Sequence, residues 1–263
     1  MFHIWQQKIL QNSIKNNSLA HAYLFSGSVG VGKLEFAFEV AKDLLKSDPA
    51  TAPDGYFYEN GLTIKEVREL KKSLALSSLN SGYKVVIINN AQKLNREAAN
   101  SMLKLLEEPA DSTVFFLITT NSFLIPQTVR SRCFELKFGY VPNTQIEKYL
   151  NTAKIKHLKP HWSGRPAIVK KLLEDKDYLS ALMAYRGDVK KFITGSLLER
   201  FKIIDKYAKM DNNDYFLQIA MEDIYAGEYK NKHIMLQQLL DLYKTFVTTN
   251  LNLQFALRAF AIK

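Results

Sequence analysis

The chain has 263 residues, of which 47% are hydrophobic and 24% charged, and it carries a net charge of +10. This composition excludes wholesale disorder. The length predicts two or three globular domains. No apolar run approaches the roughly 18 residues that a membrane helix needs. Because Cys133 is the one cysteine and the N-terminus lacks a signal-peptide pattern, we expect a cytoplasmic protein without disulfides or cysteine-rich zinc.

The first half of the sequence alternates strand patterns with amphipathic helix patterns, which is typical of an α/β fold with a parallel sheet. Apolar and β-branched runs predict buried strands, and spaced apolar positions together with N-cap residues such as Asn95 predict helices. The predicted strands cover residues 21–25, 84–88, 113–119 and 133–138. The predicted helices cover residues 33–45, 63–73, 95–106 and 129–132.

The second half contains helix patterns only, ending in a long helix predicted over residues 233–249. A proline after a glycine at residues 139–142 marks the first boundary. We therefore expect three parts. They are an α/β module over residues 1–140, a small helical segment over 141–187 and a second helical block over 188–263.

Residues 27–33 read GSVGVGK and lie between a predicted strand and a predicted helix. In that context the spacing predicts a phosphate-binding loop, in which Gly27, Gly30 and Gly32 let backbone N–H groups surround phosphates. Lys33 would then reach the outer phosphates. The alternative is a glycine turn beside an ordinary surface lysine.

The residues that should hold Mg²⁺ are missing from this motif. The position after Lys33 carries Leu34 where an active loop has Ser or Thr. The strand over residues 84–88 ends in Asn89 and Asn90 rather than in acids. A neutral amide is a poor ligand for a hard cation and cannot act as a base. The sequence thus predicts lost hydrolysis and no Mg²⁺ site, and leaves binding of ATP or ADP without hydrolysis open.

Several segments resemble the bacterial clamp-loader subunits of the AAA+ family, of the gamma/tau and delta-prime types. The resemblance is dense over residues 19–138 and faint towards the end of the chain. The matching segments are HAYLFSG at 21–27, NSMLKLLEEP at 100–109, IPQTVRSRC at 125–133 and NLNLQFAL at 250–257. The resemblance implies an α/β P-loop (AAA+) module with a parallel sheet, then a helical lid and an all-helical C-terminal collar that closes a ring.

The defective metal positions beside an intact Ser131-Arg132-Cys133 segment match the delta-prime type better than gamma/tau. The resemblance then implies a non-hydrolysing subunit of DNA polymerase III that helps to load the sliding clamp onto primer-template DNA during replication. Its implied partners are the gamma/tau and delta subunits and the clamp, and no membrane. Some relatives carry a four-cysteine zinc module, which this sequence lacks, so we expect no zinc. The collar is also shorter than in the family.

The resemblance also implies that Arg132 is the candidate catalytic residue, acting together with Ser131 on a nucleotide held by a neighbouring subunit. A guanidinium stays charged and presents forked donors that match phosphate oxygens, so it can stabilise charge developing on a γ-phosphate. The alternative is a surface arginine in an ordinary salt bridge.

Three further basic residues are weaker candidates. Arg165 lies where the family has a glycine turn opening a lid helix and could touch nucleotide, although a solvated helix start is the simpler interpretation. Lys71 and Lys72 lie near the end of the helix over residues 63–73 and could contact DNA phosphates. A solvated helix face explains them equally well.

Two other functions stay open at this point. An active gamma/tau-like ATPase would need Ser or Thr in place of Leu34 and acids in place of Asn89 or Asn90. A nucleic-acid-binding module outside any loader is compatible with the positive charge, and it predicts tight, salt-dependent DNA binding by the isolated chain.

Overall fold

The computed structural model describes residues 2–76, 78, 82–110, 112–207, 213–248, 254, 257 and 258. The chain divides into two compact units: Met1–Asn151 with Ser163–Ile168, and Thr152–Trp162 with Val169–Lys263. The three-part division drawn from the sequence stays a prediction. Its second boundary, at residue 187, falls inside the continuous helix α9 (Lys176–Thr194).

The first unit is built on a five-stranded sheet in which every strand pair is parallel. The strand order is β2-β3-β4-β1-β5, so β1 lies between β4 and β5. The strands are β1 (Ala22–Ser26), β2 (Gly55–Tyr58), β3 (Lys84–Ile88), β4 (Thr113–Thr119) and β5 (Phe134–Lys137). Because parallel strands end at the same edge, the loops after β1, β3 and β4 are brought together there.

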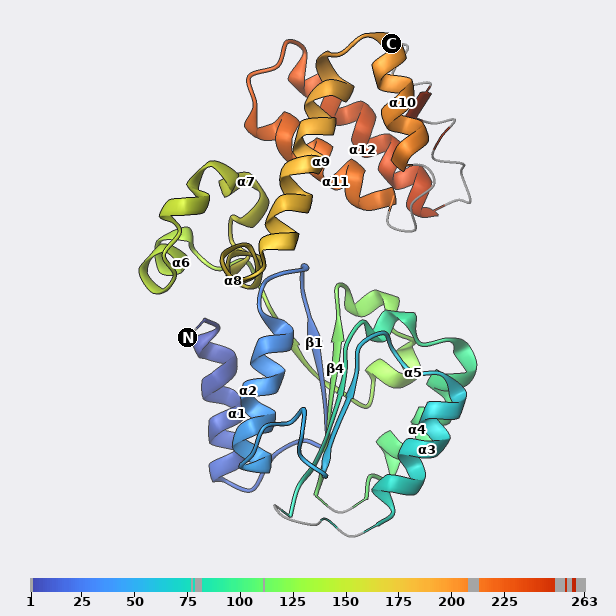
Figure 1. Ribbon diagram of the computed structural model, residues 1–263. Helices are drawn as coiled ribbons and strands as arrows, with labels where there is room; N and C mark the ends of the chain where they lie inside the picture. The colour runs from blue at the N-terminus through green and yellow to red at the C-terminus, as the bar shows by residue number, and fades with distance from the viewer. Residues whose placement is uncertain are drawn as a thin grey trace. The chain divides into compact units, whose positions relative to one another are not determined.

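Helices cover both faces of this sheet (Figure 1). On one face lie α1 (Ile4–Lys15) and α2 (Lys33–Leu45). On the other lie α3 (Ile64–Leu74), α4 (Arg96–Glu107) and α5 (Gln127–Arg130). Side chains alternate along β1, since Leu24 packs in the α3–α4 core and Tyr23 and Phe25 pack in the α1–α2 core. The sheet is therefore buried on both sides, as its apolar strands predict.

The predicted helices and strands of this unit are confirmed, with small shifts at their ends. Asn95 is the N-cap of α4, and its side chain accepts a hydrogen bond of 2.8 Å from the Ala98 N–H. α5 begins two residues earlier than predicted, because the Val129 and Arg130 N–H groups both donate to the Pro126 carbonyl oxygen. The sequence analysis missed α1 and β2 entirely.

The second unit is helical in its described residues. Its core contains the buried aromatic side chains of Trp162, Phe192 and Phe216, and the Tyr207 and Phe216 rings stack at 4.3 Å. The helices after β5 are α6 (Asn143–Tyr149), η3 (Ala153–Leu158), α7 (Lys159–Trp162), α8 (Pro166–Glu174), α9, α10 (Leu197–Tyr207), α11 (Asn213–Ala226) and α12 (Lys232–Thr248). Two of these helices are not wholly part of the second unit, since α6 belongs to the first unit and α8 begins in it.

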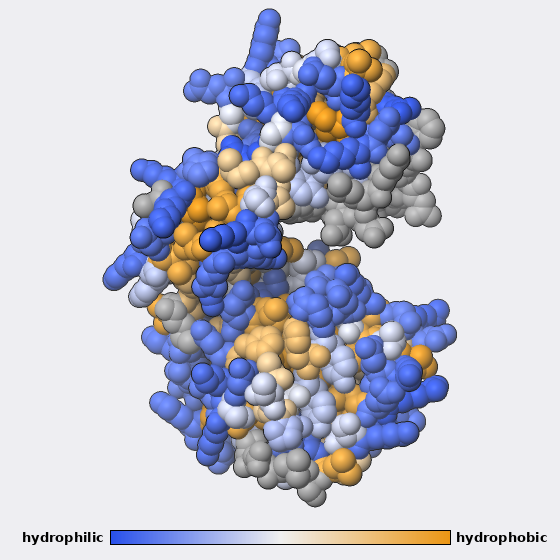
Figure 2. Space-filling view, in the orientation of Figure 1, coloured by the Kyte–Doolittle hydropathy of each residue, from blue (hydrophilic) through white to orange (hydrophobic). Residues whose placement is uncertain are grey.

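The last predicted features fall partly outside the described residues. α12 ends at Thr248, and the final residue of the predicted helix, Thr249, is not described. Most of the segment 250–257, which resembles the family's C-terminal ending, also lies outside them. No described helix is both long enough and apolar enough to cross a membrane. Hydrophobic residues on the face drawn in Figure 2 form separate patches among hydrophilic ones.

The N-cap of α4 provides a test of this local structure. Replacing Asn95 by Ala removes the side-chain acceptor for the Ala98 N–H, and we expect the free energy of unfolding to fall by about 1 kcal/mol. Urea denaturation measures this change. Asn100→Ala, at an exposed position within the same helix, is the matched control and should not destabilise the protein. Equal losses for both variants would contradict the capping role.

Candidate functional site

The loop after β1 has the backbone geometry of a phosphate-binding turn. Gly27 and Gly30 have φ angles of 149° and 81°, which residues with side chains rarely adopt. A Cβ at Gly27 would lie 2.1 Å from the Phe138 carbonyl oxygen. Gly32 is the N-cap of α2, so the loop leads directly into a helix N-terminus that favours anions. Gly27 and Gly30 are therefore required by the backbone conformation as well as by the motif.

Lys33 is 7% exposed and folds back onto this loop. Its ammonium group donates hydrogen bonds to the carbonyl oxygens of Gly27 and, at 2.7 Å, of Ser28. Burial lowers the pKa of Lys33 to about 8, while nearby Glu35 opposes this shift. A buried cation whose hydrogen-bond partners are neutral carbonyl groups is a favourable partner for an incoming anion.

A pocket of about 270 Å³ opens beside this loop, at the carboxyl edge of the sheet. The described residues that line it come from the loop, the start of α2, the ends of β2, β3 and β4, and the start of α8. They are Val29, Gly30, Gly32, Lys33, Leu34, Glu35, Glu59, Asn89, Asn90, Ile118, Thr119, Thr120 and Ala167. The predicted phosphate loop and the predicted metal positions therefore meet in one cavity.

The pocket residues at the positions where a P-loop ATPase would hold Mg²⁺ are neutral. Leu34, Asn89 and Asn90 all line the pocket. The Asn89 amide donates to Glu59 Oε1 at 3.0 Å, and the Asn90 amide donates to the Glu59 carbonyl oxygen at 3.1 Å. Both amides thus serve as donors to the end of β2. Among the described residues, no cluster of three or more His, Cys, Asp or Glu side chains could hold a metal ion.

Glu59 is a pocket residue that the sequence analysis missed. It directly follows β2, a strand that was not predicted because its short run Tyr56-Phe57-Tyr58 follows a loop rich in turn residues. The aromatic run was the available signal. Since β2 pairs in parallel with β3, an acid after β2 lies at the same edge of the sheet as Asn89.

The start of α8 lies against the phosphate loop. The Ala167 N–H donates to the Gly30 carbonyl oxygen at 3.0 Å. A Cβ at Gly30 would lie 3.3 Å from the Cβ of Arg165. Arg165 is therefore next to the loop, as the nucleotide-binding hypothesis requires, although it does not line the pocket itself. Its role stays a prediction.

Arg132 lies away from this pocket's lining and is bound within its own chain. One of its terminal amino groups donates to the Thr128 carbonyl oxygen at 2.7 Å, and the other forms an ion pair with Glu107 at the end of α4. The Arg132 side chain keeps 32% exposure and that of Glu107 keeps 46%. Ser131 is exposed and its hydroxyl donates to Thr128 O at 3.2 Å. Arg132 therefore forms the salt bridge of the alternative interpretation, and its action on a neighbour's nucleotide stays a prediction.

The lysine candidates and the cysteine do not line the pocket. Lys71 and Lys72 are exposed on the last turn of α3 and do not line the pocket, so their contact with DNA stays a prediction. Burial raises the pKa of the Cys133 thiol to about 12, so the reactive thiolate is scarce at neutral pH.

Comparison with known proteins gives a family and several relatives. Residues 4–56 and 52–142 match the family described as DNA polymerase III, delta subunit. The chain is 34% identical to the DNA polymerase III subunit delta' of Bacillus subtilis, over 54% of this chain and 49% of that protein. It is 32% identical to the tau/gamma subunit of Haemophilus influenzae, over 54% of this chain and 23% of that protein.

The chain therefore spans about half the length of the first relative and about a quarter of the second. A solved structure of a DNA polymerase III gamma-subunit-related protein from Thermotoga maritima matches with a TM-score of 0.71. It is 20% identical, and the match covers 97% of both chains. This likeness confirms the predicted fold, an α/β module with a parallel sheet followed by a helical region.

The burial of Lys33 leads to a pH-dependent prediction. In an NMR titration of the lysine ε-methylene signals, the Lys33 signal should have a midpoint near pH 8 instead of the ordinary value of 10.5. Lys33→Met identifies that signal. Saturation with ATP should raise the midpoint, since a nearby phosphate favours the charged form. Affinity should then be constant below pH 8 and fall by up to about tenfold per pH unit above it. A free-state midpoint near 10.5 would contradict the buried geometry.

Proposed function

The chain belongs to the DNA polymerase III, delta subunit family, and we propose that it is a clamp-loader subunit of the delta-prime type. The family match and the delta' relative confirm the resemblance that the sequence motifs indicated. In the proposed role the chain helps to load the ring-shaped sliding clamp onto primer-template DNA during replication. Its partners would be gamma/tau and delta subunits and the clamp.

One combination of features supports a non-hydrolysing role. The phosphate loop and Lys33 are intact, but Leu34, Asn89 and Asn90 occupy the positions where a P-loop ATPase holds Mg²⁺. Without the metal there is nothing to neutralise the charge that develops on the γ-phosphate or to orient the attacking water. Nucleotide bound in this pocket would stay unhydrolysed, and neither zinc nor Mg²⁺ is required.

In this proposal Arg132 acts in trans on ATP bound by a neighbouring gamma/tau subunit. Its guanidinium is partly exposed, and its partner Glu107 is exposed as well. An exposed ion pair contributes only about 0–1 kcal/mol, so exchanging the Glu107 carboxylate for a γ-phosphate costs little. Thr128 O would keep the other amino group in place during the exchange. Ser131 and the short helix α5 fix the backbone on which Arg132 is presented.

Contact with DNA is proposed for Lys71 and Lys72. Both ammonium groups are exposed on the same helix turn, where they can bind phosphates without reading sequence. In the assembled loader these contacts would be made by several subunits together, so the isolated chain would bind DNA weakly.

A gamma/tau-like ATPase is the second candidate function. The tau/gamma relative supports it, and so do the Glu35 and Glu59 carboxylates in the pocket lining, which could replace the missing metal ligands. Against it, Glu59 Oε1 accepts a hydrogen bond from Asn89. Dependence of nucleotide binding on Mg²⁺ separates the two functions.

If the metal ligands are lost, nucleotide affinity should be insensitive to Mg²⁺. Isothermal titration of ATP into the chain should give dissociation constants within about threefold of each other in Mg²⁺ and in EDTA, and no phosphate should be released. The double variant Leu34→Thr with Asn89→Asp should gain Mg²⁺ dependence. Tight binding that requires Mg²⁺ in the unmodified chain would favour the ATPase.

The trans role of Arg132 is tested in the reconstituted loader. With gamma/tau, delta, clamp and primed DNA, Arg132→Ala should slow hydrolysis at the one site that faces this chain by about tenfold or more. The total steady-state rate of ATP hydrolysis then falls by the fraction that this site contributes. The variant should stay folded and assemble normally, because Arg132 is a surface residue.

Arg96→Ala is the matched control, because Arg96 is an exposed arginine at the opposite end of α4 from Glu107. It should leave the rate unchanged. Equal rates for Arg132→Ala and the unmodified chain would remove the trans role of Arg132 from the proposal. Clamp-loader membership would remain, since assembly of the ring is measured separately by gel filtration.

A further inference from the structure

A second pocket, of about 470 Å³, lies in the helical unit. Its walls are one face of α9 and one face of α11, closed by a residue of η3 and by the segment after α11. The described residues that line it are His157, Met183, Arg186, Gly187, Lys190, Asp223, Ala226, Gly227 and Tyr229. Met183, Arg186, Gly187 and Lys190 are spaced as neighbours on one helix face. A pocket of this size falls in the range of small-molecule sites.

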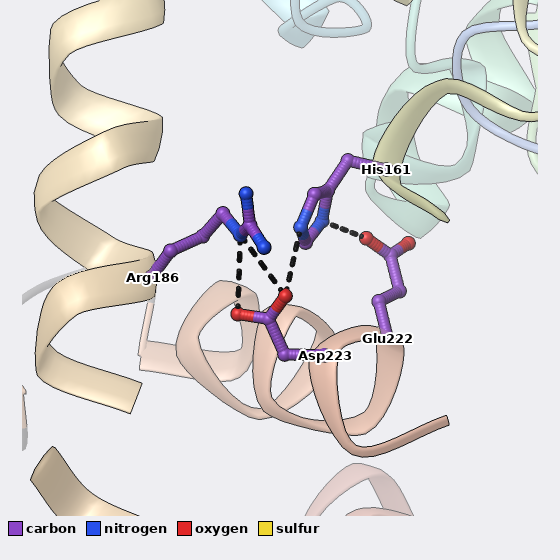
Figure 3. Close-up of polar contacts among 4 residues, drawn as sticks. All are labelled: His161, Arg186, Glu222 and Asp223. Atoms are coloured by element: carbon purple, nitrogen blue, oxygen red, sulfur yellow. Dashed lines mark hydrogen bonds and ion pairs between the residues drawn. The ribbon is translucent and has the colours of Figure 1, made fainter. Parts of the chain in front are cut away.

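A polar network holds two of the residues that line this pocket, Arg186 and Asp223 (Figure 3). His161 from α7 is 3% exposed and lies between two consecutive carboxylates of α11. Its Nδ1 is 2.6 Å from Glu222 Oε2 and its Nε2 is 3.2 Å from Asp223 Oδ1. Arg186 Nε donates to Asp223 Oδ1 at 3.0 Å. Despite burial, the hydrogen bonds and charges of these two carboxylates raise the pKa of His161.

The network engages Asp223, the acid among the described lining residues, and leaves cationic donors available. Glu222 and Asp223 are engaged by His161 and Arg186. In the part of the chain that the structure describes, Arg186 uses only its Nε, on Asp223, and neither the Lys190 ammonium group nor the His157 ring has a hydrogen-bond or ion-pair partner. Three groups that carry or can carry positive charge therefore face one cavity.

The surrounding sequence and the cavity wall agree with an anionic ligand. Residues 152–162, which include η3 and α7, contain three lysines and two histidines and no acid. Asp188 is turned to other partners, since it accepts from Lys206 at 2.6 Å and Tyr207 at 2.8 Å. At Gly187 an added Cβ would meet nothing within 4 Å, so the wall of the pocket is open at that point.

We propose that this pocket binds a phosphate group, held by the free amino groups of Arg186, by Lys190 and by His157. A forked guanidinium and an ammonium group are the donors that proteins use for phosphate. Asp223 accepts the hydrogen bond from Nε of Arg186 and so orients the two terminal amino groups of that side chain. The phosphate can belong to a free oligophosphate or to a nucleic-acid backbone, and the pocket is separate from the phosphate loop of the first unit.

The methyl group of Met183 reports on this pocket directly. In the full chain labelled with [¹³C-methyl]methionine, the Met183 signal is identified by Met183→Leu and followed during addition of sodium pyrophosphate. We expect a saturable shift at millimolar or lower concentration. A single-stranded DNA oligonucleotide is the second probe. A shift with both probes assigns the site to a nucleic-acid backbone, and a shift with pyrophosphate alone assigns it to a free oligophosphate.

Two pairs of variants test the assignment without disturbing the buried network. Lys190→Glu should weaken pyrophosphate binding by about tenfold or more, whereas Lys191→Glu, the neighbouring position outside the lining, should change it less than about twofold. Gly187→Leu should fill the pocket and abolish the shift, and Gly187→Ala should retain it. Both Gly187 changes raise helix propensity, so loss of folding does not explain the result.

No movement of the Met183 signal at millimolar pyrophosphate would overturn the proposal. Equal weakening by Lys190→Glu and Lys191→Glu would also overturn it, because the attraction would then be a general effect of surface charge. Neither outcome bears on the clamp-loader role, which rests on the first unit.

Discussion

Parallel pairing of β1 with both β4 and β5 is the constraint on which the first unit depends. It makes β1 a central, fully buried strand and sends the loop after it to the same edge as the ends of β3 and β4. That loop has no freedom to move away, since Gly27 donates its N–H to Thr119 O and lies against the Phe138 carbonyl. The phosphate loop, the amides after β3 and the start of α8 consequently share one cavity.

This cavity has some of the features expected of a phosphate-binding P-loop and lacks others. Features that depend on backbone geometry, such as the glycine turn and the N-terminus of α2, are retained along with Lys33. Features that depend on a hydroxyl group at residue 34 and a carboxylate at residue 89 are absent, because these residues are Leu34 and Asn89. Phosphate binding needs only the first set, whereas hydrolysis needs both. Arg132 belongs to neither set, because it does not line this cavity, and in the proposed function it acts on another chain's nucleotide.

The sequence was sufficient to predict the elements that carry strong local signals. The β-branched run at 84–88, the N-cap Asn95 and the glycine spacing at 27–33 each indicate their structure from a few neighbouring residues. By contrast, α1 has a weak apolar periodicity, and β2 is a run of four residues whose pairing with β3 spans about thirty positions. Short strands of this kind are decided by tertiary packing rather than by local preference.

The site was predictable to the same extent. Lys33, Leu34, Asn89 and Asn90 were found because they belong to a motif with fixed spacing. Glu59 and the Arg132–Glu107 ion pair were not found, because each joins residues far apart in the sequence, 30 positions for Asn89 and Glu59 and 25 for Arg132 and Glu107. The contacts of His161 with α11 span 61 and 62 positions, so no local sequence pattern predicted them.

The central claim is that Arg132 leaves Glu107 to contact a neighbour's nucleotide. A cryo-electron microscopy structure of the assembled loader with a non-hydrolysable ATP analogue tests it most directly. The account predicts the two terminal amino groups of Arg132 within hydrogen-bond distance of the γ-phosphate bound by the adjacent gamma/tau subunit, with Glu107 released. A map in which Arg132 still pairs with Glu107 while the adjacent site holds the analogue would contradict it.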